Sequence, residues 1–241
     1  MSEKKKMSVT QLTIVTAVNM MGSGIIMLPT NLAQVGTMSI LSWIITTIGA
    51  TMLAFIFARA GLYSSKGGGM GGYAEYSFGK AGAFLTNYTY GLSLVIANAA
   101  IAISSVGYTA VLFNVHLSPL ATAMWTIVVL WVATILNFGG ANITGRISTF
   151  TVWGVILPVI FISIVGWFYF SGSSFAKSWN PHNYSFIEGM GKSISITLWA
   201  FLGLESAAAN SDAVENPKKN VPIAVMGGTI GAAIMVSLLP I

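Results

Sequence analysis

The 241-residue chain contains no cysteine and few charged side chains. Without cysteine it can form no disulfide, no reactive thiolate and no cysteine-ligated metal site. Charged residues make up 7% of the chain and hydrophobic residues 55%, whereas soluble domains carry roughly 25% charged residues. This composition indicates an integral membrane protein.

Several functional motifs are also absent from the sequence. It has no Walker loop, nucleophile elbow or HExxH motif, so ATP-driven transport and hydrolysis have no support within the chain, no enzyme activity is predicted and no cofactor is expected. His116 and His182 are too far apart in sequence to suggest a metal site. The net charge of +5 does not predict nucleic-acid binding, because the basic residues follow membrane topology and form no patch interleaved with aromatic residues.

Long apolar stretches account for most of the chain. About 20 apolar residues are needed to cross the hydrocarbon layer. Residues 1–8 are predicted to be a cytoplasmic N-terminus, and the all-α transmembrane domain, residues 9–241, to hold seven spans: 9–35, 38–63, 83–113, 120–138, 148–170, 189–213 and 221–241. The glycine-rich residues 67–72 are expected to be too flexible for a helix, and residues 73–78 to form a short aromatic segment at the interface.

The positions of lysine and arginine predict the orientation of these spans. With the N-terminus in the cytoplasm, nine of the 11 lysine and arginine residues lie inside and only Lys177 and Lys192 lie outside, as the positive-inside rule requires. The last span reaches Ile241 without a polar flank. Truncation of a longer protein is therefore expected.

Two of the predicted spans are interrupted by small residues. The first contains Gly22-Ser23-Gly24, and the sixth contains Gly203 close to Glu205, the only acid in the apolar residues 199–207. Each glycine costs about 1 kcal/mol against alanine inside a helix, and open backbone at membrane depth is tolerated only where it lines a cavity or is buried in protein. Close helix packing through small residues is the alternative. Two broken spans at corresponding places of a repeat favour a transporter binding site.

Single side chains near these interruptions have a functional and a structural interpretation. A carboxylate at membrane depth costs about 3 kcal/mol or more, so Glu205 either serves function or bonds to the freed backbone of the broken helix. The indole of Trp199 either attracts an ammonium group or simply packs. On the third span, Asn98 belongs to a stripe of small and polar residues, with Tyr90 beside it, which either lines a pathway or joins helices. Glu75 is an interfacial acid.

Three stretches resemble a known family: residues 20–25 with Leu28-Pro29, the glycine-rich stretch followed by residues 73–76, and residues 199–206. They are similar to the basic amino acid and polyamine antiporters of the amino acid–polyamine–organocation superfamily. The resemblance covers nearly the whole chain. It implies a LeuT-like fold of twelve spans with a five-plus-five inverted repeat, of which this chain holds spans 1–5 and spans 6–7.

The resemblance also implies a function and a site. It implies a secondary transporter of the bacterial inner membrane that exchanges a cationic amino acid of the ornithine class for its diamine, of the putrescine class, where spans 1 and 6 unwind. The implied partners are these small molecules and the lipid bilayer, and formation of a homodimer is left open. The implied substrate-binding residues are Gly22, Ser23, Gly24, Ile25, Asn98, Trp199, Ala200, Leu202, Gly203 and Glu205, with Glu75 and Tyr90 associated with transport.

Physical chemistry is compatible with both ligands at one site. The backbone N–H groups that start the second half of span 1 suit a carboxylate, whereas the carbonyls that end the first half of span 6 suit an ammonium. A diamine lacks the carboxylate and would rely on Trp199, Glu205 and carbonyl groups. The alternatives are a permease for noncationic amino acids and a truncated fragment without activity.

Overall fold

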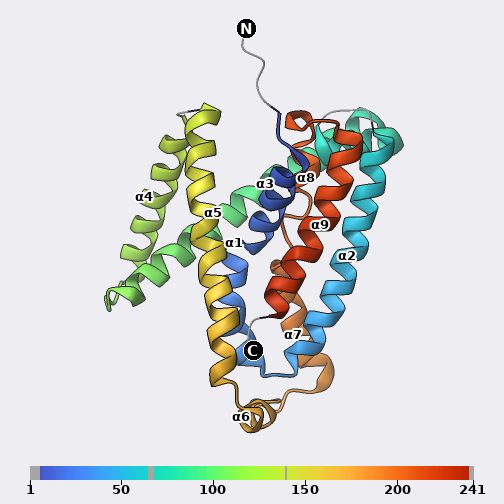
Figure 1. Cartoon of the computed structure of the whole chain (residues 1–241). Helices are drawn as coiled ribbons and strands as arrows, with labels where there is room; N and C mark the ends of the chain where they lie inside the picture. Colours follow the sequence, from blue (N-terminus) through green and yellow to red (C-terminus); the bar gives the residue numbers. More distant parts are fainter. Residues whose placement is uncertain (1–5, 65–67, 139, 239–241) are drawn as a thin grey trace. The chain divides into compact units, whose positions relative to one another are not determined.

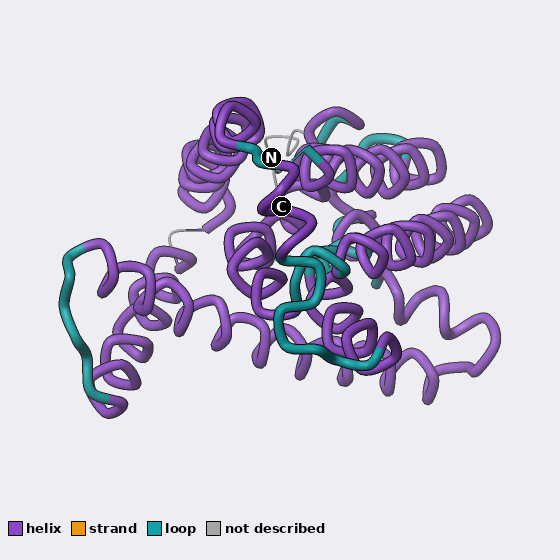
Figure 2. Tube along the Cα trace, turned by 90° about the horizontal axis from the view of Figure 1, so that it is seen from below, coloured by secondary structure: helices purple, strands orange, loops and turns teal. Residues whose placement is uncertain are grey.

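The structure, a computed structural model, describes residues 6–64, 68–138 and 140–238, without the side chains at positions 23, 26–27, 140–152 and 212. These residues are almost entirely helical, as Figure 2 shows, and the described residues form no strand beyond one isolated bridge. The predicted all-α class is thereby confirmed. The elements, of which Figure 1 labels the α-helices, are α1 (Val9–Val35), α2 (Ser39–Tyr63), α3 (Gly69–Leu112), α4 (Pro119–Phe138), α5 (Gly140–Val165), η1 (Gly166–Tyr169), α6 (Gly172–Lys177), α7 (Phe186–Trp199), α8 (Ser206–Ala209), η2 (Ser211–Ala213) and α9 (Pro217–Ser237).

The chain divides into two compact units whose boundaries fall inside helices. The first unit contains Met1–Ala83 and Val155–Ile241, and the second contains Phe84–Gly154. Helices α1, α2, α7, α8 and α9 therefore belong to the first unit, together with the start of α3 and the end of α5. The second unit holds the rest of α3, all of α4 and the start of α5.

Several helices have the length and composition of membrane spans. Among the described residues, α2, α3, α4 and α9 are long and apolar enough to cross a bilayer, and Val9–Gly22 and Trp153–Tyr169 are shorter apolar helices. The chain is thus a multi-pass membrane protein. Which of the seven predicted segments cross the bilayer stays a prediction.

Apart from the buried Trp43, helix α2 buries mainly small and polar residues and exposes large apolar ones. Its buried side includes Ser39, Ser42, Thr46, Ala50, Ala54, Ala58 and Gly61, and its exposed side chains include Ile44, Ile45, Ile48, Met52, Phe55 and Ile56. Small residues let transmembrane helices approach closely, and hydroxyl groups bond across the interface. The hydroxyl groups of Ser42 on α2 and Ser193 on α7 are hydrogen-bonded in this way.

Helix α9 lies between α1 and α2 and contacts both (Figure 1). A Cβ atom on Gly228 would lie 2.9 Å from the Thr16 side chain of α1, and one on Gly227 would lie 3.3 Å from Thr13. Around this contact Leu12, Val221 and Val225 are at most 1% exposed. The first half of α1 is therefore packed directly against α9.

The start of α3 differs from the sequence-based expectation. Residues 67–72 were expected to be non-helical and the span to begin near residue 83, but α3 begins at Gly69 and kinks at Gly79, where φ is 64° and ψ is −165°. Gly69 has a φ of 57°, and a Cβ atom there would lie 2.9 Å from the Cα atom of Ala209. This glycine therefore serves close backbone packing against α8.

A first backbone clasp joins the turn between α1 and α2 to the segment before α7. The amide of Thr37 donates to the Ser178 carbonyl at 2.9 Å, and the amide of Met38 donates to the Trp179 carbonyl at 3.1 Å. Gly36, with φ at 102°, ends α1 here, and a Cβ atom on it would lie 2.5 Å from Pro181. Only glycine fits this position without rearrangement.

A second backbone clasp joins the segment before α1 to the connection between α8 and α9. Met7 pairs with Val214 in a parallel bridge: the Met7 amide donates to the Ala213 carbonyl at 2.9 Å, and the Glu215 amide donates to the Met7 carbonyl at 3.1 Å. The two clasps lie at opposite ends of α1. In the first clasp, the turn after α1 bonds to the segment before α7; in the second, the segment before α1 bonds to the connection after α8. This reciprocal pairing is the relation expected between the halves of an inverted repeat.

Candidate functional site

The first interruption lies within α1, at the position that the sequence predicted. Gly22 has φ at −32° and ψ at −140°, far from helical values, so two helical segments meet there at a kink. A Cβ atom on Gly22 would meet nothing within 4 Å. The backbone at this residue therefore borders open space.

The second interruption separates α7 from α8, again where the sequence predicted it. Helix α7 ends at Trp199, and residues 200–205 form turns before α8 begins at Ser206. Gly203 has φ at 110°, a conformation that L side chains rarely adopt. Its amide donates to the Glu205 carboxylate at 3.0 Å. Through this hydrogen bond Glu205 stabilises the turn at Gly203, as the structural interpretation of this acid predicted.

The two interruptions are in direct contact through two glycines. A Cβ atom on Gly203 would lie 2.9 Å from the Asn19 carbonyl carbon and 3.0 Å from the Met20 nitrogen. In the same way, a Cβ atom on Gly24 would lie 3.0 Å from Cδ1 of Trp199. Because Asn19 meets Gly203 and Gly24 meets Trp199, the two interrupted segments run in opposite directions where they cross. Each segment contributes one glycine to the close contact.

The second interruption presents groups that attract a cation. The Phe201 carbonyl accepts a hydrogen bond from the Leu204 amide at 3.4 Å, whereas no donor from the described part of the chain reaches the carbonyls of Ala200 and Leu202. These carbonyls follow the C-terminus of α7, where the helix dipole favours positive charge. Trp199 remains 37% exposed beside them, and an indole face attracts ammonium groups.

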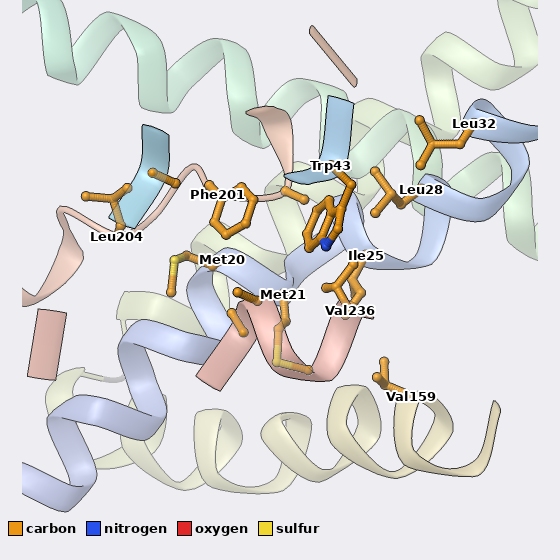
Figure 3. Packing of buried hydrophobic residues seen from close by; sticks show 14 residues of the cluster. Met20, Met21, Ile25, Leu28, Leu32, Trp43, Val159, Phe201, Leu204 and Val236 are labelled. Atoms are coloured by element: carbon orange, nitrogen blue, oxygen red, sulfur yellow. The ribbon is translucent and has the colours of Figure 1, made fainter. Parts of the chain in front are cut away.

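The turn at residues 200–205 contributes one ring to a buried aromatic pair. Phe201, which is 1% exposed, stacks on Trp43 of α2 with ring centroids 4.9 Å apart. Figure 3 shows the two rings among Met20, Met21 and Ile25 of α1, which belong to the same cluster. The side chain of Ile25 is 2% exposed, so its contribution to a ligand site would come from its backbone.

The structure brings together only part of the predicted site. Gly24 on α1 lies against Trp199 and Ala200, and Gly203 lies against Asn19 and Met20. Ile25 shares a buried cluster with Ala200. Gly22 is at the kink of α1, and Leu202 and Glu205 belong to the turns at residues 200–205. Ser23 is helical, but its side chain lies outside the described residues. Asn98 and Tyr90 belong to the second unit, and Glu75 to the start of α3 in the first. Their participation in the site stays a prediction.

A separate cavity of about 460 Å³ lies at the far end of α1. Pro29 and Leu32 of α1 line it together with Tyr169, Phe175 and Ser178 from η1 and the region of α6. None of its lining residues is charged. It offers no counter-charge for a cation and does not include the interrupted segments.

Comparisons with known proteins identify the family. The model of the amino acid permease family matches residues 7–241. The chain belongs to the amino acid permease family. The chain is 67% identical to the putrescine transporter PotE of Haemophilus influenzae (strain Rd) over 97% of its length, and 62% identical to PotE of Escherichia coli K12 over the same share. It is 39% identical to the cadaverine/lysine antiporter of Escherichia coli K12 over 95% of its length.

These relatives are named transporters and not enzymes, as expected from the absence of hydrolytic and nucleotide-binding motifs. The chain covers 54% of the Haemophilus protein, 53% of the Escherichia coli PotE and 51% of the cadaverine/lysine antiporter. It thus spans about half the length of the curated relatives that it matches.

Proposed function

We propose that this chain forms the substrate-binding half of a secondary transporter that exchanges a diamine of the putrescine class for a cationic amino acid of the ornithine class. The observation that carries the proposal is the direct contact between the two interruptions through Gly24 and Gly203. Discontinuous helices that meet in this way form the substrate sites of inverted-repeat transporters. The names of the relatives, one of which pairs cadaverine with lysine, support a diamine and its parent amino acid as the exchanged pair.

Each end of the amino acid has a complementary group at the interruptions. The helical segment that follows Gly22 begins with N–H groups and the positive end of a helix dipole, which suits the carboxylate. The carbonyls of Ala200 and Leu202 at the end of α7 suit an ammonium, and Trp199 adds an aromatic surface. A diamine carries a second ammonium in place of the carboxylate. We assign that group to Glu205, which is partly exposed beside the same turn.

The proposed orientation places the N-terminus in the cytoplasm of a bacterial cell, with the transporter in the inner membrane. The support is the distribution of lysine and arginine, because this orientation puts nine of the 11 on the cytoplasmic side, as the positive-inside rule requires. With this orientation Met7 and the second clasp face the cytoplasm. A homodimer stays a prediction.

Exchange can be tested in vesicles that contain a fusion of residues 1–241 with the C-terminal half of the Haemophilus relative, since the curated relatives are about twice as long. Vesicles loaded with labelled ornithine should release it when putrescine is added outside and should retain it when leucine is added. Release by leucine as readily as by putrescine would support a permease for noncationic amino acids. Retention of ornithine under both conditions would contradict the exchange function.

The role of Glu205 can be tested in the same fusion and by putrescine binding to the 241-residue chain in lipid nanodiscs. Glu205→Gln should weaken putrescine binding by about 1.5–3 kcal/mol, the contribution of a hydrogen bond to a charged group, which is about 10- to 150-fold in Kd. The matched control is Glu188→Gln, because Glu188 is exposed on α7 and pairs with Lys192 at 2.9 Å. Unchanged affinity in Glu205→Gln would contradict the assignment of the second ammonium to this side chain and support its structural role at Gly203.

A further inference from the structure

Trp43 of α2 is the only described residue outside the two interruptions that stacks on a ring within either of them. Its side chain is 5% exposed, and its ring is tilted by 23° against that of Phe201 at a centroid distance of 4.9 Å. Phe201 is the central residue of the turn between the carbonyls of Ala200 and Leu202. Figure 3 shows the two rings next to each other, with Met20 and Met21 of the same cluster close by.

The orientation of the Trp43 ring is determined by α9. The indole N–H donates to the Ser237 hydroxyl at 2.9 Å, and this hydroxyl donates to the Ala233 carbonyl at 2.7 Å. A buried indole N–H requires such a partner. Trp43 therefore joins three elements: α2, which carries it, α9, which orients it, and the turn at residues 200–205.

We propose that Trp43 is a positioning residue for the substrate site and that it acts through Phe201 on the carbonyls at either side. The assignment of a ligand to these carbonyls rests on the proposed function, but the control of the turn by Trp43 does not. In place of an α-helical ladder, residues 200–205 are held by turn hydrogen bonds, in which the amides of Ala200, Phe201 and Leu202 donate to carbonyls three residues earlier, and by further contacts. The buried Phe201 side chain and the bond between the Gly203 amide and Glu205 are two of these contacts.

Loss of the stacked pair should lower the population of the binding-competent turn. The apparent Kd rises in inverse proportion to the fraction of protein in the competent conformation. The stacking energy of an aromatic pair corresponds to about two- to tenfold in that population. Trp43→Leu should therefore weaken putrescine binding by about this factor, although Trp43 does not itself contact the proposed ligand.

The test uses the 241-residue chain in lipid nanodiscs and takes advantage of the absence of native cysteine. A nitroxide label attached through Leu202→Cys reports the mobility of the turn without any ligand, and putrescine affinity is measured separately on the unlabelled folded protein. In Trp43→Leu the label should become more mobile and the affinity should fall. Trp43→Phe should retain most of both properties because it keeps the ring, and Ser237→Ala should give an intermediate result.

The matched control is Trp131→Leu on α4, because Trp131 is 60% exposed. Equal label mobility and equal affinity in Trp43→Leu and the parent would overturn the proposal, as would an equal loss in Trp131→Leu. If Trp43→Leu does not fold, Trp43→Phe combined with Ser237→Ala replaces it, under the same criteria. If the parent chain does not bind putrescine, the proposed ligand site is contradicted, and the ligand-free label mobility still decides the role of Trp43.

Discussion

Gly203 should be among the least replaceable residues of the first unit. Its φ of 110° is unfavourable for any side chain, and a residue held in such a region costs about 1–3 kcal/mol. In addition, an alanine Cβ atom would lie within 3.0 Å of the Asn19 carbonyl and the Met20 nitrogen. These are backbone atoms, which cannot rotate away, and overpacking of this kind adds about 1–3 kcal/mol. The Gly203→Ala variant should therefore lose about 2–6 kcal/mol of unfolding free energy.

The measurement is unfolding of the purified chain in mixed micelles with increasing denaturing detergent, compared with Gly191→Ala. Gly191 lies within α7, and a Cβ atom there would meet nothing within 4 Å. Alanine at this helical position should stabilise the protein by up to about 1 kcal/mol. If Gly203→Ala proves as stable as the parent chain, the contact between the two interruptions is not formed as described, and the proposed site loses its main support.

Three further substitutions test neighbouring contacts. Gly24→Ala should lower putrescine affinity more than stability, because its Cβ atom would lie 3.0 Å from the Trp199 side chain, which can shift; an unchanged Kd would be evidence against this role for Trp199. Gly228→Ala should destabilise the protein by about 1–3 kcal/mol, since its Cβ atom would lie 2.9 Å from Thr16, whereas Gly231→Ala, which meets nothing within 4 Å, should not; equal unfolding curves would contradict the packing of α1 on α9. Met7→Cys combined with Val214→Cys should form a disulfide on mild oxidation, because the two residues are bridged and paired Cα atoms lie about 5 Å apart; a failure of the two positions to cross-link would contradict the second clasp.

The interruptions of both helices were predictable because their signals are local. Gly22 and Gly24 interrupt an apolar stretch, and Glu205 follows Gly203 in another, so the cost of these residues in a helix at membrane depth was evident without any tertiary information. The structure has non-helical backbone at Gly22 and at residues 200–205. The family resemblance, carried by the same residues, was also confirmed.

Features that depend on distant residues were not predictable from these patterns. Gly69 was interpreted as part of a flexible stretch, but its positive φ and small size serve its contact with Ala209, which lies far away in sequence. Trp43 has no local signal that distinguishes it from a lipid-facing tryptophan, and its importance depends on its contacts with Phe201 and Ser237. A sequence pattern records which residues share one helix face, whereas such contacts depend on how helices pair.

The second clasp has a consequence for how the protein is made. At about 5–20 residues per second, the ribosome takes on the order of 10–40 s to extend the chain from Met7 to Val214. During that time α1 has been synthesised, but neither partner of its N-terminal segment exists, and the backbone that meets Gly203 is uncovered. Helix α1 can reach the arrangement described above only after α8 and the start of α9 have emerged. Biogenesis of the first interrupted helix is therefore coupled to synthesis of the second, and substitutions near residues 203 or 214 should impair membrane integration of a helix made much earlier.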